Sequence, residues 1–206
     1  MGNSGCDYAE RMETLPTLRE HKKAVTRRSL AAAALRLAVE RGLDGVTVED
    51  IADEAGVSRR TFSNYFTGKE DAVLAAERER TRALVALLEA RPARERPWQA
   101  LRAATAERYR AWPVPDVEWT AQLRLLRRHP SLLARQAADQ VALERDLTAV
   151  LAAREPGLGE DVARLTAATF LATVRTGIAL WLESAGTRPL PELVDGLLGR
   201  VRVEGT

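Results

Sequence analysis

Residues 46–66 have the sequence VTVEDIADEAGVSRRTFSNYF, whose spacing predicts two short helices joined by a tight turn. Apolar and small side chains recur there at intervals of three and four, as they do where two crossing helices share a small core. Gly56 supplies the left-handed backbone conformation that the turn requires. We therefore expect a helix-turn-helix motif, with helices at residues 48–55 and 59–66.

A capping residue precedes each of these helices. Thr47 stands before the first helix and has Asp50 three positions on, at the spacing of a capping box. Ser58 stands before the second helix. Because the caps, the turn and the core spacing agree, several independent features predict the same motif.

The helix at 59–66 presents a polar face if Phe62 and Phe66 face inward with a period of 3.6 residues. The outward residues are Arg59, Arg60, Ser63 and Asn64. Arginine pairs bidentately with guanine and asparagine with adenine, so this face can read base edges in a major groove. Two cations in a first turn oppose the helix dipole and call for an anion, which DNA would supply. The alternative is a plain solvated face.

The charge around the motif favours DNA as well. Residues 19–69 contain ten Lys or Arg and seven Asp or Glu, a net charge of +3, whereas the whole chain carries only +2. Four of these acidic residues lie on the first short helix, which we expect to leave the second helix free of them. They are Glu49, Asp50, Asp53 and Glu54.

Further basic residues flank the motif. Lys69 begins a long predicted helix at 69–89. The free N–H groups of the helix start and the ammonium group of Lys69 would together hold a phosphate. The alternative is that Lys69 is an incidental surface lysine. The front of the first predicted helix, 19–41, is also basic and could reach phosphate or the minor groove. Its basic residues are Arg19, Lys22, Lys23, Arg27 and Arg28.

The chain as a whole is predicted to be all-α, because period-2 alternation is almost absent and proline and glycine breaks separate about nine helices. Arg91–Pro97 (RPARERP) is a charged linker and the clearest compositional boundary. The helices beyond it are expected at 98–111, 116–128, 131–154, 160–184 and 190–203. We expect a frayed arm at 1–18, a helix-turn-helix domain at 19–68 and a second helical domain at 69–206.

Composition excludes several classes of protein. With 206 residues, 46% apolar and 29% charged, the chain is typical of a globular, water-soluble protein. Cys6 is the only cysteine and no signal peptide is recognisable, so we expect a cytoplasmic protein. Leu165–Leu182 is interrupted by Arg175 and four threonines, which favours a buried helix over a membrane span. No metal-ligand spacing, nucleophile motif or phosphate loop is present, so neither a cofactor nor an enzymatic activity is expected.

The run from Arg27 to Leu74 resembles the DNA-binding domain of the TetR family of bacterial regulators, through AAAALRLAVERG, VTVEDIADEAGVSRRTFSNYF and TGKEDAV. Later stretches, HPSLLARQ, LWLESAG and PLPELVDGLL, resemble the regulatory domains of actinobacterial members. The resemblance implies that the long fourth helix joins a three-helix reading domain to a ligand-binding and dimerisation domain. It also implies DNA contacts at Thr47, Arg59, Arg60, Thr61, Ser63, Asn64, Tyr65 and Lys69.

The second domain carries signs of self-association. The helix at 160–184 is apolar on more than one face, and the helix at 190–203 has a matching apolar stripe. One side can pack inward while the other meets a second subunit, and a homodimer would read a palindrome. The resemblance implies a four-helix bundle formed by these two helices of each subunit. The alternative is that both helices are plain monomer core.

The second domain also contains candidate ligand residues. Trp98, Trp112 and Trp119 could line a cavity for an apolar or amphipathic small molecule, although aromatic residues at helical spacing also form plain core. Arg175 lies midway along an apolar helix and is expected to be buried with an anion. That anion is Glu118, Glu144, the dimer mate or the ligand itself.

We therefore predict a ligand-responsive transcriptional regulator, a repressor that binds a palindromic operator as a homodimer and is released by a small molecule. An activator or a ligand-blind regulator is the first alternative. A helical adaptor protein is a remote one, since basic residues at helix starts suit DNA better. A small helical enzyme lacks any set of nucleophile, base and orienting group.

Overall fold

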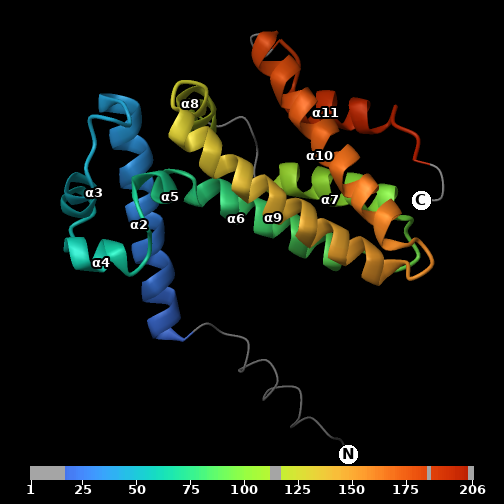
Figure 1. Ribbon diagram of the computed structural model, residues 1–206, viewed down its shortest axis with the longest axis horizontal. Helices are drawn as coiled ribbons and strands as arrows, with labels where there is room; N and C mark the ends of the chain where they lie inside the picture. The colour runs from blue at the N-terminus through green and yellow to red at the C-terminus, as the bar shows by residue number, and fades with distance from the viewer. Residues whose placement is uncertain (1–16, 112–116, 185–186, 204–206) are drawn as a thin grey trace, which may run out of the picture. The chain divides into compact units, whose positions relative to one another are not determined.

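The structure is a computed structural model that describes three stretches of the chain: residues 17–111, 117–184 and 187–203. These residues form helices and connecting loops without a strand, so the all-α prediction is confirmed (Figure 1). The chain divides into two compact units, Met1–Val73 and Leu74–Thr206, whereas we had placed the boundary between residues 68 and 69. Ten helices lie in the described stretches, one more than expected.

The first unit has four helices in its described residues. They are α2 (Leu18–Arg41), α3 (Val48–Glu54), α4 (Arg59–Ser63) and α5 (Lys69–Val73). α2 packs against α3 and α5, and α3 packs against α4. The largest fully buried side chains of this core include Leu30, Leu37, Ile51 and Phe62.

The predicted caps and turn of the helix-turn-helix are confirmed. The Asp50 N–H donates to Thr47 Oγ1 at 3.1 Å and the Thr47 N–H donates to Asp50 Oδ2 at 2.8 Å, which completes the capping box. The hydrogen bond from the Thr47 hydroxyl, followed by the one from its N–H, holds the pKa of the Asp50 carboxyl below its usual value. Ser58 Oγ accepts from the Thr61 N–H at 3.1 Å, and Gly56 has a φ of 68°.

The long helix expected at 69–89 is interrupted at Leu74, which accounts for the extra helix. α5 ends at Val73 and α6 begins at Ala75. Leu74 has φ −87° and ψ −2°, a ψ far from the value of about −42° in a regular α-helix. Residues 71–75 on both sides of this break are buried.

The second unit has six helices in its described residues. They are α6 (Ala75–Glu89), α7 (Pro97–Ala111), α8 (Val117–Leu126), α9 (Pro130–Arg154), α10 (Glu160–Glu183) and α11 (Leu190–Leu198). α10 packs against α9, α11 and α7, and α6 packs against α7 and α9 (Figure 1). The core of this unit includes Leu88, Leu101, Leu147, Phe170, Trp181 and Val194.

The charged segment Arg91–Pro97 lies inside the second unit, so it is not the boundary that its composition suggested. The guanidinium of Arg154, at the end of α9, donates to three main-chain oxygens around this segment. The acceptors are Leu88 at 3.2 Å, Arg91 at 2.9 Å and Pro92 at 2.7 Å. These bonds fasten the link between α6 and α7 to α9, which is why a polar, proline-bounded stretch does not separate two domains here.

α10 is apolar on more than one side, but only one side is buried within the chain. Phe170 and Trp181 face the core, whereas Leu165 is 62% exposed and Leu180 is 41% exposed. By length and composition, α10 is the one helix in the described stretches that could cross a membrane, a test that core helices of soluble proteins also pass. Within one chain, then, one side of this helix packs inward as expected, and the side that we expect to meet a second subunit is exposed.

Candidate functional site

α4 has a buried side and a polar side, as predicted. Phe62 and Phe66 are buried, with their ring centroids 5.6 Å apart, and they hold the helix against the core of the first unit. On the other side Arg60, Ser63 and Asn64 are exposed. The helix is only five residues long, so these side chains lie within about one and a half turns.

Arg59 differs from the other residues of this face because it has a carboxylate partner. Arg59 Nη1 lies 2.7 Å from Glu49 Oε1, at the first turn of α3. The expectation that the acidic residues of α3 leave α4 free is therefore wrong for Glu49. The positive charge of Arg59 at the start of α4 is therefore neutralised by the carboxylate of Glu49, and not only by an outside anion.

Arg60 and Asn64 remain available to an outside partner. Arg60 is exposed, and none of the ion pairs found in the described stretches involves it. Asn64 is the residue after the last turn of α4 and is also exposed. Thr61 is half-buried, and its hydroxyl lies 2.9 Å from Ser58 Oγ, within the cap of the helix. Ser63 is exposed and donates to the Arg59 carbonyl at 3.2 Å.

Arg27 and Tyr65 join α2 to the end of the motif. Arg27 Nη1 donates to the Tyr65 carbonyl at 3.0 Å, and its Cζ lies 4.6 Å from the centre of the Phe66 ring. Both Arg27 and Tyr65 are half-buried. Thr47 is engaged in the capping box of α3. These three residues therefore hold the polar face of α4 in position.

Lys69 has structural partners that the sequence did not reveal. Its Nζ donates to the carbonyl oxygens of Leu43 at 2.9 Å and Val46 at 3.0 Å, and the side chain is half-buried. These carbonyls belong to the loop between α2 and α3, so Lys69 fastens that loop to the start of α5. An ammonium group has three N–H donors, and two are used here.

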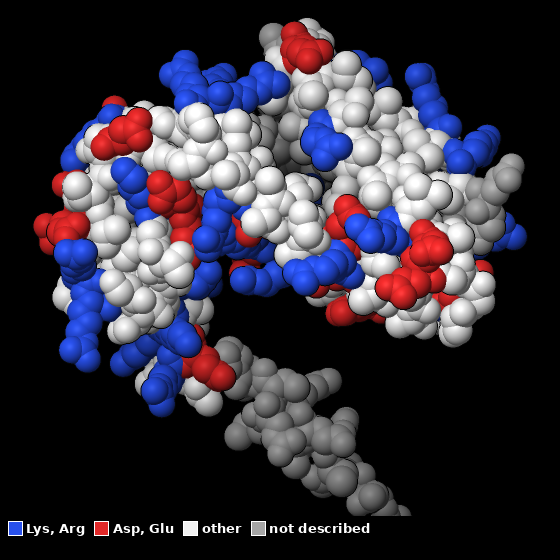
Figure 2. All heavy atoms as spheres, viewed as in Figure 1, with Lys and Arg blue, Asp and Glu red and all other residues white. Residues whose placement is uncertain are grey.

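Basic side chains gather near the N-terminal part of α2 and at α4 (Figure 2). In α2 they are Arg19, Lys22, Lys23 and Arg28, all exposed. The capping box of Thr17 and Glu20 holds the start of this helix in the described part of the chain. The first unit therefore has a local cationic surface despite the small net charge of the chain.

The second unit contains a cavity of about 380 Å³, lined by side chains from α6 to α10. Most of its lining is apolar and includes Leu84, Trp119, Phe170, Ile178 and Leu182. Trp119 packs against Trp181 with ring centroids 6.0 Å apart. A concave, mostly apolar site of this size is typical of small-molecule pockets.

The predicted ligand residues have different positions. Trp119 and Arg175 line this cavity, whereas Trp98 does not. Trp98 Nε1 donates to the Leu198 carbonyl at 3.0 Å and its ring meets Phe170 edge-on, which makes it a core residue between α7, α10 and α11. Trp112 lies outside the described residues.

Arg175 is exposed at the cavity lining, so the expectation that it is buried is wrong for the single chain. Neither carboxylate that we had considered is its partner. Glu144 pairs instead with Arg164, at 3.2 Å, and no ion pair joins Arg175 to Glu118. The exposed side of α10 in one chain gives the long arginine side chain access to water without an internal anion.

One polar group of the cavity was missed by sequence reasoning. Arg80 Nε lies 3.0 Å from Glu77 Oε2, and Arg80 Nη2 donates to Gln122 Oε1 at 2.8 Å. Gln122 is buried, with 2% of its surface exposed. Arg80 and Glu77 are three residues apart on a charged helix, where such pairs are ordinary surface features, so no signal in the sequence marked them.

Two family models match the chain. The model for bacterial regulatory proteins of the tetR family matches residues 30–76, and the model for the MftR C-terminal domain matches residues 95–203. The HTH-type transcriptional regulator TcmR of Streptomyces glaucescens is 35% identical over 180 residues, which cover 84% of this chain and 80% of TcmR. The chain belongs to the TetR family. It is therefore a transcriptional regulator with a helix-turn-helix.

Two solved structures share the fold of this TetR-family chain. FadR from Bacillus subtilis, in complex with stearoyl-CoA, is 20% identical with a TM-score of 0.58, covering 86% of this chain and 98% of FadR. SmeT, in complex with triclosan, is 20% identical with a TM-score of 0.59, covering 88% of this chain and 93% of SmeT. At this level of identity they establish the fold alone.

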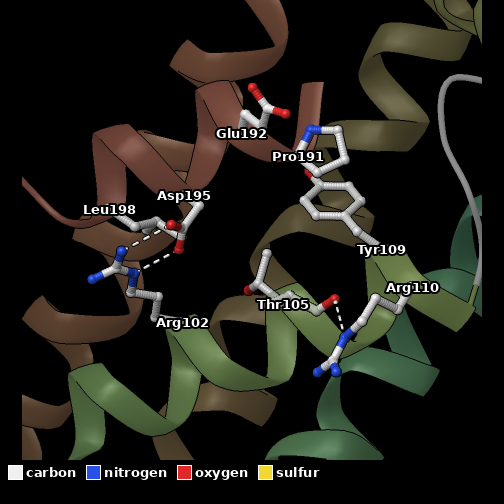
Figure 3. A pocket seen from close by; sticks show the side chains of 9 residues that line it. Arg102, Thr105, Tyr109, Arg110, Pro191, Glu192, Asp195 and Leu198 are labelled. Atoms are coloured by element: carbon white, nitrogen blue, oxygen red, sulfur yellow. Dashed lines mark hydrogen bonds and ion pairs between the residues drawn. The ribbon is translucent and has the colours of Figure 1, made fainter. Parts of the chain in front are cut away.

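The TetR-family chain has a second hollow of about 330 Å³ between α7 and α11 (Figure 3). Arg102 on α7 forms two bonds with Asp195 on α11, Nε to Oδ1 at 2.6 Å and Nη2 to Oδ2 at 2.8 Å. Tyr109 lies beside Pro191 in this hollow, and burial raises the pKa of its hydroxyl. Among the described residues, no cluster of side chains could hold a metal ion.

Proposed function

We propose that this TetR-family chain is a repressor that binds a palindromic operator as a homodimer and leaves the operator when a small molecule binds its second unit. The observation that carries the proposal is the exposed face of α4, held by a capped helix-turn-helix. Arg60 and Asn64 on this face have the donors and acceptors that distinguish guanine and adenine in a major groove. Such a protein acts in the cytoplasm, where bacterial DNA lies.

The proposed DNA contacts fall into two groups. Arg60, Ser63 and Asn64 are proposed to meet base edges, with Arg59 joining them once it leaves Glu49. The other proposed contacts are to phosphate or position the face: Arg27, Thr47, Thr61, Tyr65 and Lys69. In this assignment Lys69 would use its remaining N–H on a phosphate while the other two keep the loop in place.

The proposed dimer forms through α10 and α11. In one chain α10 leaves Leu165 and Leu180 exposed, and a long apolar helix of this kind is usually covered. A two-fold pairing of α10 and α11 would cover this face and would place two reading units on one palindrome.

The proposed effector site is the cavity of about 380 Å³ in the second unit. FadR and SmeT, which share the fold, have been solved with stearoyl-CoA and triclosan bound, respectively. These complexes support the proposal that a small molecule with a large apolar part acts on this chain. An effector regulates DNA binding only if it binds the free and the DNA-bound states with different affinity.

Selection of bound duplexes from a random pool, with the full-length chain, tests the DNA-binding part of the proposal. We expect the selected sequences to share a palindrome, and light scattering to give twice the mass of one 22.7 kDa chain. Leu165→Glu should yield a monomer that binds the palindrome weakly. Val141→Glu, on an exposed site of α9, is the matched control and should remain a dimer.

A reporter gene placed behind the selected palindrome tests the direction of regulation. Repression by the chain, relieved by an effector, is the expected result. Increased expression would assign the chain as an activator instead. Selected DNA without a palindrome, bound by a monomer, would contradict the proposal as a whole.

A further inference from the structure

The cavity of the second unit carries more positive than negative charge. Four arginines line it, whereas Glu77 is its only carboxylate in the residues that the structure describes. The arginines are Arg80 on α6, Arg108 on α7, Arg127 after α8 and Arg175 on α10. They come from four parts of the chain, so the charge is gathered by the fold and not by a local run of sequence.

Only one of these arginines is neutralised within the protein. Arg80 pairs with Glu77 at 3.0 Å and is largely buried, which uses the single carboxylate. None of the ion pairs found in the described stretches involves Arg108, Arg127 or Arg175. Three of the arginines that line this cavity therefore have no matching carboxylate among its lining residues.

Arg108 is also held in place. Its Cζ lies 4.5 Å from the centre of the neighbouring Tyr109 ring, so the guanidinium plane is packed against an aromatic face. The guanidinium also lies near the Tyr109 hydroxyl, and stacking on a ring face leaves its outer N–H groups able to donate to a further group. The side chain is half-buried, which reduces the number of water molecules that can screen its charge.

Apolar surface adjoins two of the three charges, Arg175 and Arg127. Leu171 and Ile178 line the cavity one turn before and one turn after Arg175 on α10. Leu123 precedes Arg127 by one turn and also lines the cavity. A ligand that contacts these arginines therefore meets hydrocarbon immediately beside its polar group.

We propose that the effector is an amphipathic anion, with an apolar body against the leucine and aromatic lining and a carboxylate or phosphate bound by Arg108, Arg127 and Arg175. This inference rests on the proposed function, because it names the chemical class of the small molecule that acts at this cavity. A guanidinium cannot lose its proton in a protein, so these three positive charges persist at any pH and attract an anion. A cationic ligand would find no unmatched carboxylate, and a neutral one would leave the three arginines to water.

Four molecules with the same tail test the class of ligand: dodecanoate, dodecyl phosphate, dodecanol and dodecyltrimethylammonium. Isothermal titration of the full-length dimer, below the micelle concentrations, measures each dissociation constant. We expect either anion to bind at least about tenfold more tightly than dodecanol, since hydrogen bonds to charged groups are among the stronger ones. Comparison of dodecanoate with dodecyl phosphate identifies the preferred head group.

Variants then test the three arginines. In the triple variant Arg108→Gln, Arg127→Gln, Arg175→Gln, we expect the affinity for the better anion to fall to that for dodecanol. The affinity for dodecanol itself should be unchanged, because glutamine keeps a long side chain without the charge. The three single variants assign the loss to individual arginines, and thermal unfolding checks that each variant is folded.

A second triple variant is the matched control. Arg94→Gln, Arg124→Gln, Arg145→Gln removes the same charge from exposed positions of the second unit that do not line the cavity. It should bind the anions as the unchanged chain does. An equal loss in both triple variants would show that the effect comes from net charge alone, and the inference would be wrong.

Other outcomes separate this inference from the proposed function. If dodecanol or the cation binds as tightly as the anions, or if neither anion binds to a chain that binds its operator, the effector is not an amphipathic anion and the proposed function stands. If the unchanged chain selects no operator from random duplexes, the proposed function fails whatever the cavity binds.

Discussion

Arg59, in the first turn of α4, is paired with Glu49, in the first turn of α3, at a distance of 2.7 Å. The pair joins the two helices of the motif and neutralises a cation that would otherwise oppose the dipole of α4. Both side chains are more than half exposed, 71% for Arg59 and 51% for Glu49, so the pair contributes less than about 1 kcal/mol to stability. A DNA phosphate or a guanine can therefore compete with Glu49 for Arg59.

Glu49→Gln should strengthen binding to DNA of any sequence. It frees Arg59 and removes a negative charge that repels phosphate, so the slope of log affinity against log salt should steepen by about one unit. Asp53→Asn is the control, because it removes one charge from an exposed site of the same helix. Fluorescence anisotropy at several salt concentrations makes the measurement. Equal gains in both variants would show that Arg59 has no special part in the effect.

Arg60→Ala should weaken binding to the selected operator by about 1–3 kcal/mol, the range for loss of a bidentate contact to a base. Arg60 is exposed and unpaired among the described residues, so its removal leaves no buried group unsatisfied. Binding to a random duplex should change much less. Competition assays with both duplexes test this, and a uniform loss would assign Arg60 to phosphate instead.

Lys69→Met should lower the free energy of unfolding of the first unit by about 2 kcal/mol. The variant keeps an unbranched side chain but loses two charge-assisted bonds, to Leu43 and Val46. Thermal unfolding at constant salt measures the stability of this variant and of the control Lys22→Met, on an exposed site of α2. We expect only Lys69→Met to unfold at a lower temperature than the unchanged chain. An unchanged melting temperature together with weaker DNA binding would mean that Lys69 acts through phosphate alone.

Gly177→Ala should destabilise the packing of α10 on α11. A Cβ at this position would lie 2.8 Å from Val194 Cγ2 and 3.5 Å from Val194 Cα. Valine is stiff at χ1, so overpacking costs about 1–3 kcal/mol, more than the gain of up to about 1 kcal/mol from the better helix propensity of alanine.

Gly196→Ala provides the contrast on the neighbouring helix α11. A Cβ there meets no atom within 4 Å, so only the gain in helix propensity remains. Urea unfolding should therefore show Gly177→Ala less stable, and Gly196→Ala slightly more stable, than the unchanged chain. A stabilised Gly177→Ala would mean that α11 moves away at little cost.

The sequence predicted the helix-turn-helix well because its signals are local. Thr47 and Ser58 bond to N–H groups three residues away, and Gly56 adopts its conformation without help from distant residues. The break at Leu74 has no such signal. Neither proline nor glycine stands near it, so no local feature of the sequence marks the change in torsion angles at Leu74.

The sequence also could not predict which side chains contact residues that are distant in the chain. Lys69 reaches Leu43 and Val46 more than twenty residues away in the chain, and no pattern marks those carbonyls as acceptors. For the same reason Trp98 and Trp119 looked alike as ligand residues. Their environments differ only once α7 and α8 are placed in the folded unit, with Trp98 in the core and Trp119 at the cavity.

The chain passes from the first unit to the second between Val73 and Leu74, at a point where one helix has ended and the next has not begun. A crossover between two related genes at this point would interrupt no helix and would fall between two compact units. The first family model ends shortly after this point, at residue 76, and the second starts at residue 95. Recombination at this point would join an existing DNA-binding unit to a second unit with a different effector cavity in one step. Point mutation would have to change the lining of the cavity residue by residue.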